Sequence, residues 1–302
     1  MNIDKAIHVK DLVKFYGKTQ ALFGVDLEVK RGEVYGFLGP NGAGKTTTIR
    51  CMLDLIRPQS GSISMLGINP QEEPEAVKER VGYLPGELHV DENMTPKQIF
   101  RYFNRLRGNR SDWDFIEELS KRLKLELNTP IKNFSKGNKQ KVGVVQALMH
   151  KPELLLLDEP TGGLDPLMQQ EVLSMLAEAQ EKGATVFFSS HIISEVQSVA
   201  DRVAIIRDGK IVEVAETAAL LNRSRRKVRI RFQQPTKVDD LLKLPGVELL
   251  SEDETLGAVM EVEGEMDALI KGLAKYPISD FETERTSLEE IFLTYYHSKE
   301  EK

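Results

Sequence analysis

The 302-residue sequence has one cysteine, one tryptophan and no long apolar run. Cys51 cannot form an internal disulfide, and with no cluster of ligand residues around it we expect no cysteine-based metal site. The longest apolar block, Leu154–Leu157, is far shorter than the roughly 18 to 20 residues that a membrane-spanning helix needs. Met1–Lys5 leads directly into alternating sequence without a charged and apolar leader, so we expect no secretion.

An excess of positive charge is also missing. Lys and Arg total 41 against 47 Asp and Glu, for a formal net charge of −6, which argues against a general nucleic-acid binder. Hydrophobic residues make up 40% and charged residues 29%, a balance typical of a globular protein. The length favours one large domain and one smaller domain. These properties together predict a cytoplasmic protein.

The first two thirds of the chain alternate short apolar runs with segments of helical period. The runs that we expect to be strands are Ile7–Val9, Leu27–Val29, Val34–Leu38, Leu154–Leu157, Thr185–Phe188 and Val203–Ile206. Arg207–Lys210 carries an Asp-Gly hairpin signal before Ile211–Val212. The pattern becomes helical between about Thr95 and Asn128, which predicts a helical insertion (about residues 90–150) in an α/β core.

The composition changes after Leu221. Arg223–Lys227 is strongly basic and is typical of a linker, while Val228–Phe232 alternates as a half-buried strand does. We expect a further strand at Val259–Val262 and a helix over Glu265–Tyr276. The sequence therefore predicts a large domain over residues 1–221 and a small α+β domain over 222–302.

A glycine-rich motif follows the expected strand Val34–Leu38. The segment Gly39-Pro40-Asn41-Gly42-Ala43-Gly44-Lys45-Thr46 fits G-x-x-x-x-G-K-[ST] without a mismatch, and a helical stretch from Thr47 to Leu55 follows it. Glycines let backbone N–H groups converge on an anion, and the helix N-terminus adds partial positive charge. We expect Lys45 to bridge the β- and γ-phosphates of a nucleotide and Thr46 to bind magnesium. The candidate phosphate-binding residues are Gly39, Pro40, Asn41, Gly42, Ala43, Gly44, Lys45, Thr46 and Thr47.

Two acidic residues end the apolar run at Leu154–Leu157. Ligands of α/β sheets bind at this end of the strands. Asp158 suits a magnesium-orienting role, because this cation prefers oxygen ligands. Glu159 could polarise the attacking water. His191 follows the next buried strand at the same edge, although a lone histidine is more often structural than functional.

These motifs resemble those of the nucleotide-binding subunit of a bacterial ABC transporter, over roughly residues 3–215. Asn133–Gln140 stands where that family places its LSGGQ signature, and Ser135 and Gly137 match it. Phe134, Lys136 and Asn138 depart from it, which leaves the detail of the γ-phosphate contacts open.

Other positions take their roles from this resemblance alone. Tyr16 resembles the aromatic residue that stacks on adenine, Gly163–Asp165 resembles the loop that crosses to a partner subunit, and His191 resembles the switch histidine. Gly86 stands where the family has a glutamine, and Glu87 follows it. Either Glu87 or a water would face the magnesium, or this loop only relays movement.

The resemblance implies a P-loop NTPase core with an antiparallel β subdomain and an inserted helical subdomain. It implies an ATPase with ATP and magnesium as ligands, two ATP molecules held between two copies of the chain, and a membrane-spanning permease as partner, with no nucleic acid. The chain would then be peripheral on the inner face of the membrane. The C-terminal segment resembles, less specifically, the accessory domain of drug- and lipid-exporter subunits, with Ser287–Phe292 as its motif.

Three alternatives remain. A soluble P-loop kinase would share the phosphate loop but has no reason to carry the signature segment. A non-transport ABC-type ATPase that acts on ribosomes or DNA is closer, although such proteins usually carry two cassettes or long insertions. A regulatory ATP-binding module would be expected to lack Asp158 and Glu159. The basic segment Arg223–Arg231 could contact anionic lipid, but a solvated linker and strand face is the favoured interpretation.

Overall fold

The structure, a computed structural model, describes residues 4–222, 226–253 and 257–285. It divides into two compact units, Met1–Ala215 and Glu216–Lys302, so the division falls after residue 215, whereas the sequence predicts it after residue 221. The motif Ser287–Phe292 and the first residues of the basic linker, 223–225, lie outside the described residues.

A six-stranded sheet forms the centre of the first unit, in the order β5-β6-β7-β3-β8-β9. Its strands are β3 (Val34–Leu38), β5 (Val81–Leu84), β6 (Leu154–Asp158), β7 (Thr185–Ser190), β8 (Arg202–Arg207) and β9 (Lys210–Glu216). The first five strands of that order pair in parallel, so their carboxyl ends share one edge. Every residue of β3, β6 and β7 is buried, as their apolar sequences predict.

The predicted hairpin between β8 and β9 is confirmed. Asp208 (φ 48°) and Gly209 (φ 71°) both have positive φ, as a two-residue type I′ turn requires.

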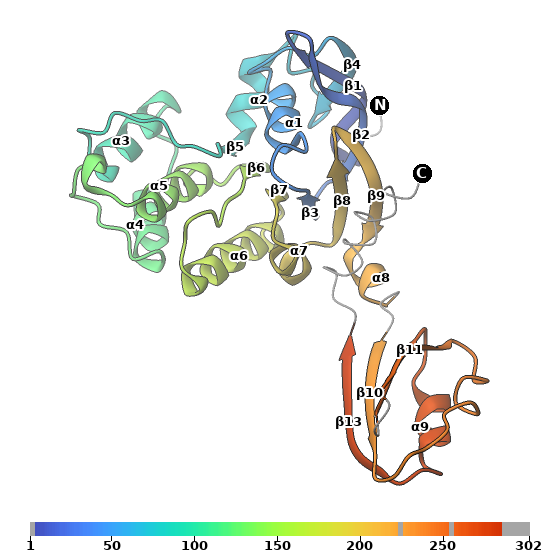
Figure 1. Cartoon of the computed structure of the whole chain (residues 1–302). Coiled ribbons are helices and arrows are strands. Elements are labelled where there is room, and N and C mark those ends of the chain that lie inside the picture. The colour runs from blue at the N-terminus through green and yellow to red at the C-terminus, as the bar shows by residue number, and fades with distance from the viewer. Residues whose placement is uncertain (1–3, 223–225, 254–256, 286–302) are drawn as a thin grey trace. The chain divides into compact units, whose positions relative to one another are not determined.

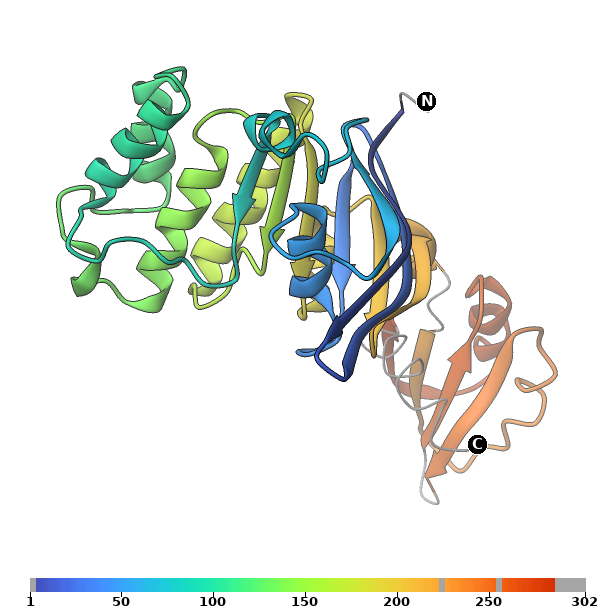
Figure 2. The same cartoon turned by 90° about the horizontal axis from the view of Figure 1, so that it is seen from above.

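A second, antiparallel sheet packs against the central one. It consists of β1 (Lys5–Tyr16), β2 (Thr19–Lys30) and β4 (Ser60–Met65), in the order β2-β1-β4. Its buried side chains, including Ile7 and Leu12, share one core with Phe37 of β3 and Leu156 of β6. Figure 2 shows these blue strands beside the central sheet, on the side away from the green helices.

Helices cover the central sheet and form the predicted insertion. The helices of this unit are α1 (Lys45–Met52), α2 (Pro74–Arg80), α3 (Pro96–Leu106), α4 (Trp113–Arg122), the short η1 (Ile131–Asn133), α5 (Lys136–Leu148), α6 (Pro166–Glu181) and α7 (Ile193–Val199). Between β5 and β6 the chain forms α3, α4 and α5, which lie together on one side of the sheet (Figure 1). Thr95, Asp112 and Ser135 cap the three helices with side-chain oxygens, which explains where each begins.

The second unit begins with α8 (Thr217–Asn222) and contains a four-stranded sheet in the order β11-β12-β10-β13. Its other elements are β10 (Arg226–Phe232), β11 (Val247–Asp253), β12 (Gly257–Val262), α9 (Asp267–Leu273) and β13 (Ile278–Arg285). The expected strands within β10 and β12 and the expected helix at α9 are confirmed. Val228 and Ile230 of β10, Met260 of β12 and Leu269 of α9 share a separate core.

The register of this sheet accounts for the basic residues of β10. On its outward face, basic and acidic residues stand opposite one another across the strands: Lys227 and Glu261, Arg229 and Glu282, and Arg231 and Asp280. Opposite charges in directly paired positions stabilise antiparallel strands. The register therefore favours a solvated, internally neutralised strand face over a lipid-binding surface.

We expect the stability of the first unit to fall in mild acid because of His150. This residue follows α5, its Nε2 lies 3.3 Å from the Val81 carbonyl oxygen, and its buried Nδ1 has no partner. Burial, and then the positive charge of Arg107, lower the pKa of His150 to about 4. Since an unfolded histidine titrates near 6.5, the unfolded state gains a proton first, and the free energy of unfolding falls as pH drops from about 6.5 to 4, by about 3 kcal/mol.

Urea unfolding followed by the fluorescence of Trp113 measures this effect, because the chain has one tryptophan and it lies in the first unit. His150→Gln should reduce the loss of unfolding free energy between pH 7 and 4.5. His89→Gln changes a histidine whose side chain is 84% exposed, so the pH dependence of the unfolding free energy should stay as in the parent. An unchanged slope in His150→Gln would contradict the assignment.

Candidate active site

The glycine-rich loop joins the end of β3 to the start of α1. Gly42 (φ 82°) and Gly44 (φ 110°) adopt backbone conformations that other residues rarely tolerate. A Cβ at Gly39 would lie 2.4 Å from the carbonyl oxygen of Ile206, so the chain passes β8 too closely for a side chain. The loop therefore turns tightly around the N-terminus of α1, where free N–H groups favour an anion.

Lys45 is held inside this loop. Its side chain is 5% exposed, and its ammonium group donates to the carbonyl oxygens of Gly39 (2.6 Å) and Pro40 (3.1 Å). The same nitrogen lies 3.4 Å from Oε1 of Glu159. The positive charge is thus fixed at the mouth of the loop and faces the carboxylate that follows β6.

Asp158 lies at the end of β6 and is 1% exposed. Its Oδ2 accepts a hydrogen bond from Oγ1 of Thr46 (2.6 Å), and its Oδ1 accepts one from Oγ of Ser189 (2.6 Å). Burial first, and then the negative charge of Asp158, raise the pKa of Tyr83. A carboxylate and a hydroxyl that meet at the edge of a phosphate loop are oxygen donors of the kind that magnesium prefers, so these residues fit that cation.

Glu159 adopts a left-handed backbone conformation (φ 51°), which is unusual for a residue with this side chain. Two contacts hold it there: its N–H donates to Oγ of Ser189 (3.0 Å), and its carbonyl oxygen accepts from Nε2 of Gln140 (2.8 Å). Strained residues of this kind gather at active sites. The geometry turns the Glu159 carboxylate towards Lys45 and His191.

His191 completes this group. It follows β7, its side chain is 44% exposed, and its Nδ1 lies 3.3 Å from Oε1 of Glu159. Lys45 at the start of α1 and His191 after β7 therefore contact the same carboxylate oxygen. The structure brings together Lys45, Thr46, Asp158, Glu159 and His191: the first two begin α1 after the glycine-rich loop, and the other three lie at or just after the carboxyl ends of β6 and β7.

A buried network that the sequence analysis did not assign supports His191. Glu195 of α7 accepts from Oγ1 of Thr161 and from Oγ of Ser190, both at 2.5 Å, and all three residues are buried. The network ties the segment after Glu159 to the residue before His191. Ser189 and Gln140 were missed as well; only the position of Ser189 at the end of a buried strand could have indicated a role.

Comparisons with known proteins agree with this geometry. Residues 22–162 match the model of the ABC transporter family, and residues 221–296 match the C-terminal domain of ATP-binding proteins like DrrA1-3. The bacitracin transport ATP-binding protein BcrA of Bacillus licheniformis is 36% identical, over 78% of both chains. The daunorubicin resistance ATP-binding protein DrrA3 of Streptomyces coeruleorubidus is 34% identical, over 96% of this chain and 95% of its own.

The chain belongs to the ATP-binding subunits of bacterial ABC transporters. A solved ATP-binding subunit of an ABC transporter is 31% identical, covers 71% of this chain and 91% of its own, and superposes with a TM-score of 0.66. The predicted fold class, a P-loop NTPase core, is confirmed. The protein is an ATPase whose hydrolysis of ATP powers transport. Among the described residues, no helix is long and apolar enough to cross a membrane.

The signature segment begins α5. Oγ of Ser135 accepts a hydrogen bond from the N–H of Asn138 (3.2 Å) and so caps the helix. A Cβ at Gly137 would lie 2.6 Å from the carbonyl oxygen of Gly163, so the signature packs closely against the loop before α6. Gln140, one turn further along α5, makes the bond to Glu159 described above. The signature helix is thereby connected to the backbone of the acidic strand end.

Tyr16 and Gly86 stand at the edges of the site. Tyr16 ends β1 with 48% of its surface exposed, and the ammonium of Lys14 lies 5.4 Å from its ring centre. A Cβ at Gly86 would lie 3.1 Å from Oδ2 of Asp158. The Glu87 side chain is 83% exposed, and its carboxylate lies 4.0 Å from Nε2 of His89. Gly86 is therefore the residue of this loop that lies against Asp158.

Proposed function

We propose that the chain drives export of an amphiphilic compound through a separate membrane-spanning permease, at the inner face of the membrane. The observation that carries the proposal is the match over nearly the whole chain, accessory domain included, to a relative named for daunorubicin resistance. A second relative is named for bacitracin transport. The two named compounds differ in chemistry, which supports a shared transport mechanism rather than one particular cargo.

The phosphate loop would bind ATP. N–H groups of the loop from Asn41 onward surround the anion at the start of α1. Lys45 turns from two carbonyl oxygens to the β- and γ-phosphates, and the exposed ring of Tyr16 stacks on adenine.

Thr46 and Asp158 would hold magnesium, which neutralises phosphate charge during hydrolysis when it is bound. The Thr46 hydroxyl bonded to Asp158 supports this assignment. Gly86 supplies no side chain next to Asp158, and Glu87 lies outside that set of contacts, so we assign the remaining ligand positions to water.

Glu159 would accept the proton of the attacking water, and His191 would position the γ-phosphate and the Glu159 carboxylate. Their 3.3 Å separation supports a joint role. One chain carries one phosphate loop and one signature, so Ser135 and Gly137 would contact the ATP bound by a second copy. Closure of such a dimer follows from contacts made only when ATP is present.

The permease would dock in a groove of about 440 Å³ between α1 and the helical insertion. Leu55, Leu88 and Phe103 supply apolar walls, and Arg50 and Arg107 supply positive charge. Leu55 is 49% exposed, so its side chain is accessible to an apolar partner in this groove. A short permease segment with apolar and acidic residues would complement this groove.

Co-purification from solubilised membranes tests the proposal. The tagged chain should retain a multi-span membrane protein, and Leu55→Asp should reduce its yield by about tenfold without loss of ATP binding. Ile270→Asp likewise replaces an exposed aliphatic side chain by a carboxylate, but in the second unit, and should leave the yield unchanged. Recovery of ribosomal or DNA-bound proteins in place of a membrane protein would instead support the non-transport alternative.

A further inference from the structure

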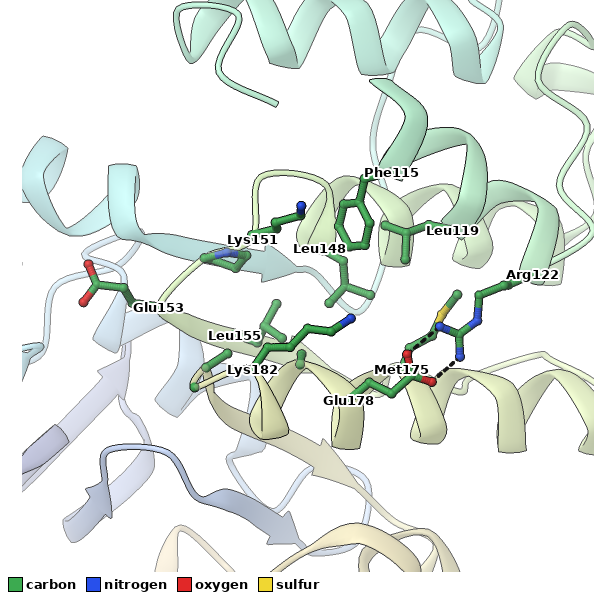
Figure 3. Close-up of a pocket in the computed structure, with 14 residues that line it drawn as sticks. Phe115, Leu119, Arg122, Leu148, Lys151, Glu153, Leu155, Met175, Glu178 and Lys182 are labelled. Atoms are coloured by element: carbon green, nitrogen blue, oxygen red, sulfur yellow. Dashed lines mark hydrogen bonds and ion pairs between the residues drawn. The ribbon is translucent and has the colours of Figure 1, made fainter. Parts of the chain in front are cut away.

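A cavity of about 260 Å³ lies at the opposite end of β6 from the ATP site. It is enclosed by α4, the end of α5, the start of β6 and the end of α6 (Figure 3). Apolar side chains form its walls: Phe115, Leu119, Leu148, Leu155 and Met175. None of the residues assigned to the ATP site lines it, so the cavity needs an explanation of its own.

Some of the charged side chains around the cavity are already paired with one another. Arg122 is fully engaged, because it donates to Glu171 (2.6 Å) and to both oxygens of Glu178 (2.7 and 2.5 Å). These bonds from Arg122 lower the pKa of Glu178. Glu153, at the far rim, is bound through both oxygens by Arg80, at 2.6 Å each. The carboxylates that line the cavity are therefore already neutralised.

Two lysines at the rim have no such partner. The Lys151 ammonium lies 4.5 Å from the ring centre of Phe115. Figure 3 shows the Lys182 side chain extending into the space between Leu155 and Arg122. Within the described part of the chain, no carboxylate forms an ion pair with Lys151 or Lys182. The mouth of this apolar cavity thus carries two ammonium groups outside any direct ion pair. Glu178, one turn before Lys182, feels the charge of that lysine, but both of its oxygens accept hydrogen bonds from Arg122.

Two of the last carbonyl groups of α6, beside Lys182, accept hydrogen bonds from the backbone. The N–H of Gly183 donates to the Gln180 carbonyl (2.8 Å), and the N–H of Ala184 donates to the Ala179 carbonyl (3.0 Å). This is the Schellman arrangement, which satisfies the last carbonyl groups of α6. The ammonium of Lys182 remains available to an anion from outside the chain.

We propose that this cavity binds a small amphiphilic monocarboxylate, with its apolar part among Leu155, Phe115 and Met175 and its carboxylate at Lys182 and Lys151. A cavity of about 150 Å³ lined by apolar side chains holds benzene. The present volume therefore fits a chain or ring of about eight carbons. Because α4 belongs to the helical insertion and α6 to the ATPase core, the bound compound contacts both and stabilises their packing.

Methyl NMR of protein labelled at its methionines tests the proposal with octanoate as the probe. The Met175 methyl signal should shift saturably with octanoate, while Met52 and Met260, which lie in other cores, should not shift. Octylammonium has the same chain and the opposite charge, so it should bind at least about tenfold more weakly. Equal shifts with octanoate and octylammonium would overturn the charge assignment, and no shift with octanoate would overturn the site.

Matched variants separate the two halves of the site. Lys182→Met keeps the apolar stem and removes the charge, and should weaken octanoate about tenfold, while Lys121→Met on the exposed face of α4 should not. Ala179→Phe fills the cavity from α6 and should abolish the Met175 shift. If Ala179→Phe does not fold, the comparison of Lys182→Met with Lys121→Met still tests the proposal: equal affinity of the two variants for octanoate contradicts it.

Discussion

Replacement of Glu159 by glutamine is expected to reduce steady-state ATP hydrolysis by about 100- to 10,000-fold, the range that loss of a general base produces. The amide cannot accept the proton of the attacking water. The backbone contacts of residue 159 with Ser189 and Gln140 do not involve the carboxylate, so its unusual conformation should persist. The variant should therefore fold and bind ATP.

The same variant should accumulate as a dimer. With the charge beside Lys45 removed, the ammonium remains free for the phosphates, and ATP stays bound because it is not hydrolysed. Phosphate release measures the rate, and light scattering with and without saturating ATP measures the mass. A monomer at saturating ATP would contradict the proposed ATP-dependent dimer, and a rate equal to that of the parent would show that Glu159 is not the general base.

Two glutamates serve as comparisons for this change. Glu181→Gln alters an exposed residue at the end of α6 and should keep the parental rate. Glu87→Gln addresses the choice that the sequence left open in the loop after β5. Its carboxylate is 83% exposed and lies outside the contacts of Asp158, so hydrolysis by the isolated subunit should stay within about twofold of the parent.

Local patterns made the phosphate loop and the acidic strand end predictable. The loop from Gly39 to Thr46 needs glycines and a lysine at fixed spacing, and β6 is a continuous buried run that ends at Asp158. Parallel pairing of β3, β6 and β7 then places Lys45, Glu159 and His191 at one edge, as expected for such a sheet.

The supporting contacts could not be read from spacing. Gln140 reaches the Glu159 carbonyl from a helix 19 positions earlier in the chain, and Ser189 bonds to Asp158 from a neighbouring strand. The bond from Gln140 depends on how the helical insertion packs, and the bond from Ser189 depends on which strands pair; no local pattern encodes either. The strands β4 and β11 were missed for a different reason: β4 begins Ser-Gly-Ser, and β11 has consecutive leucines at an irregular register, so neither shows clean alternation.

Replacement of Lys45 by alanine is expected to lower ATP affinity by about 100-fold or more, because the point charge for the β- and γ-phosphates is lost. The substitution also removes the cation 3.4 Å from Glu159, so that carboxylate would face the incoming phosphate with one positive neighbour fewer. Both effects oppose binding. Calorimetric titration with ATP measures the affinity, and Lys121→Ala, an exposed change on α4, should leave it unchanged.

Stability must be measured beside affinity, because Lys45 also has a structural role. Without its ammonium group the carbonyl oxygens of Gly39 and Pro40 lose a donor, at a cost of about 1–3 kcal/mol if they remain buried. Urea unfolding followed by Trp113 gives that cost without ATP. In the parent, saturating ATP should raise the unfolding midpoint by mass action, and in Lys45→Ala this increase should vanish. A variant that unfolds at lower urea but still gains the full increase from ATP would show that Lys45 supports the loop and does not bind the nucleotide.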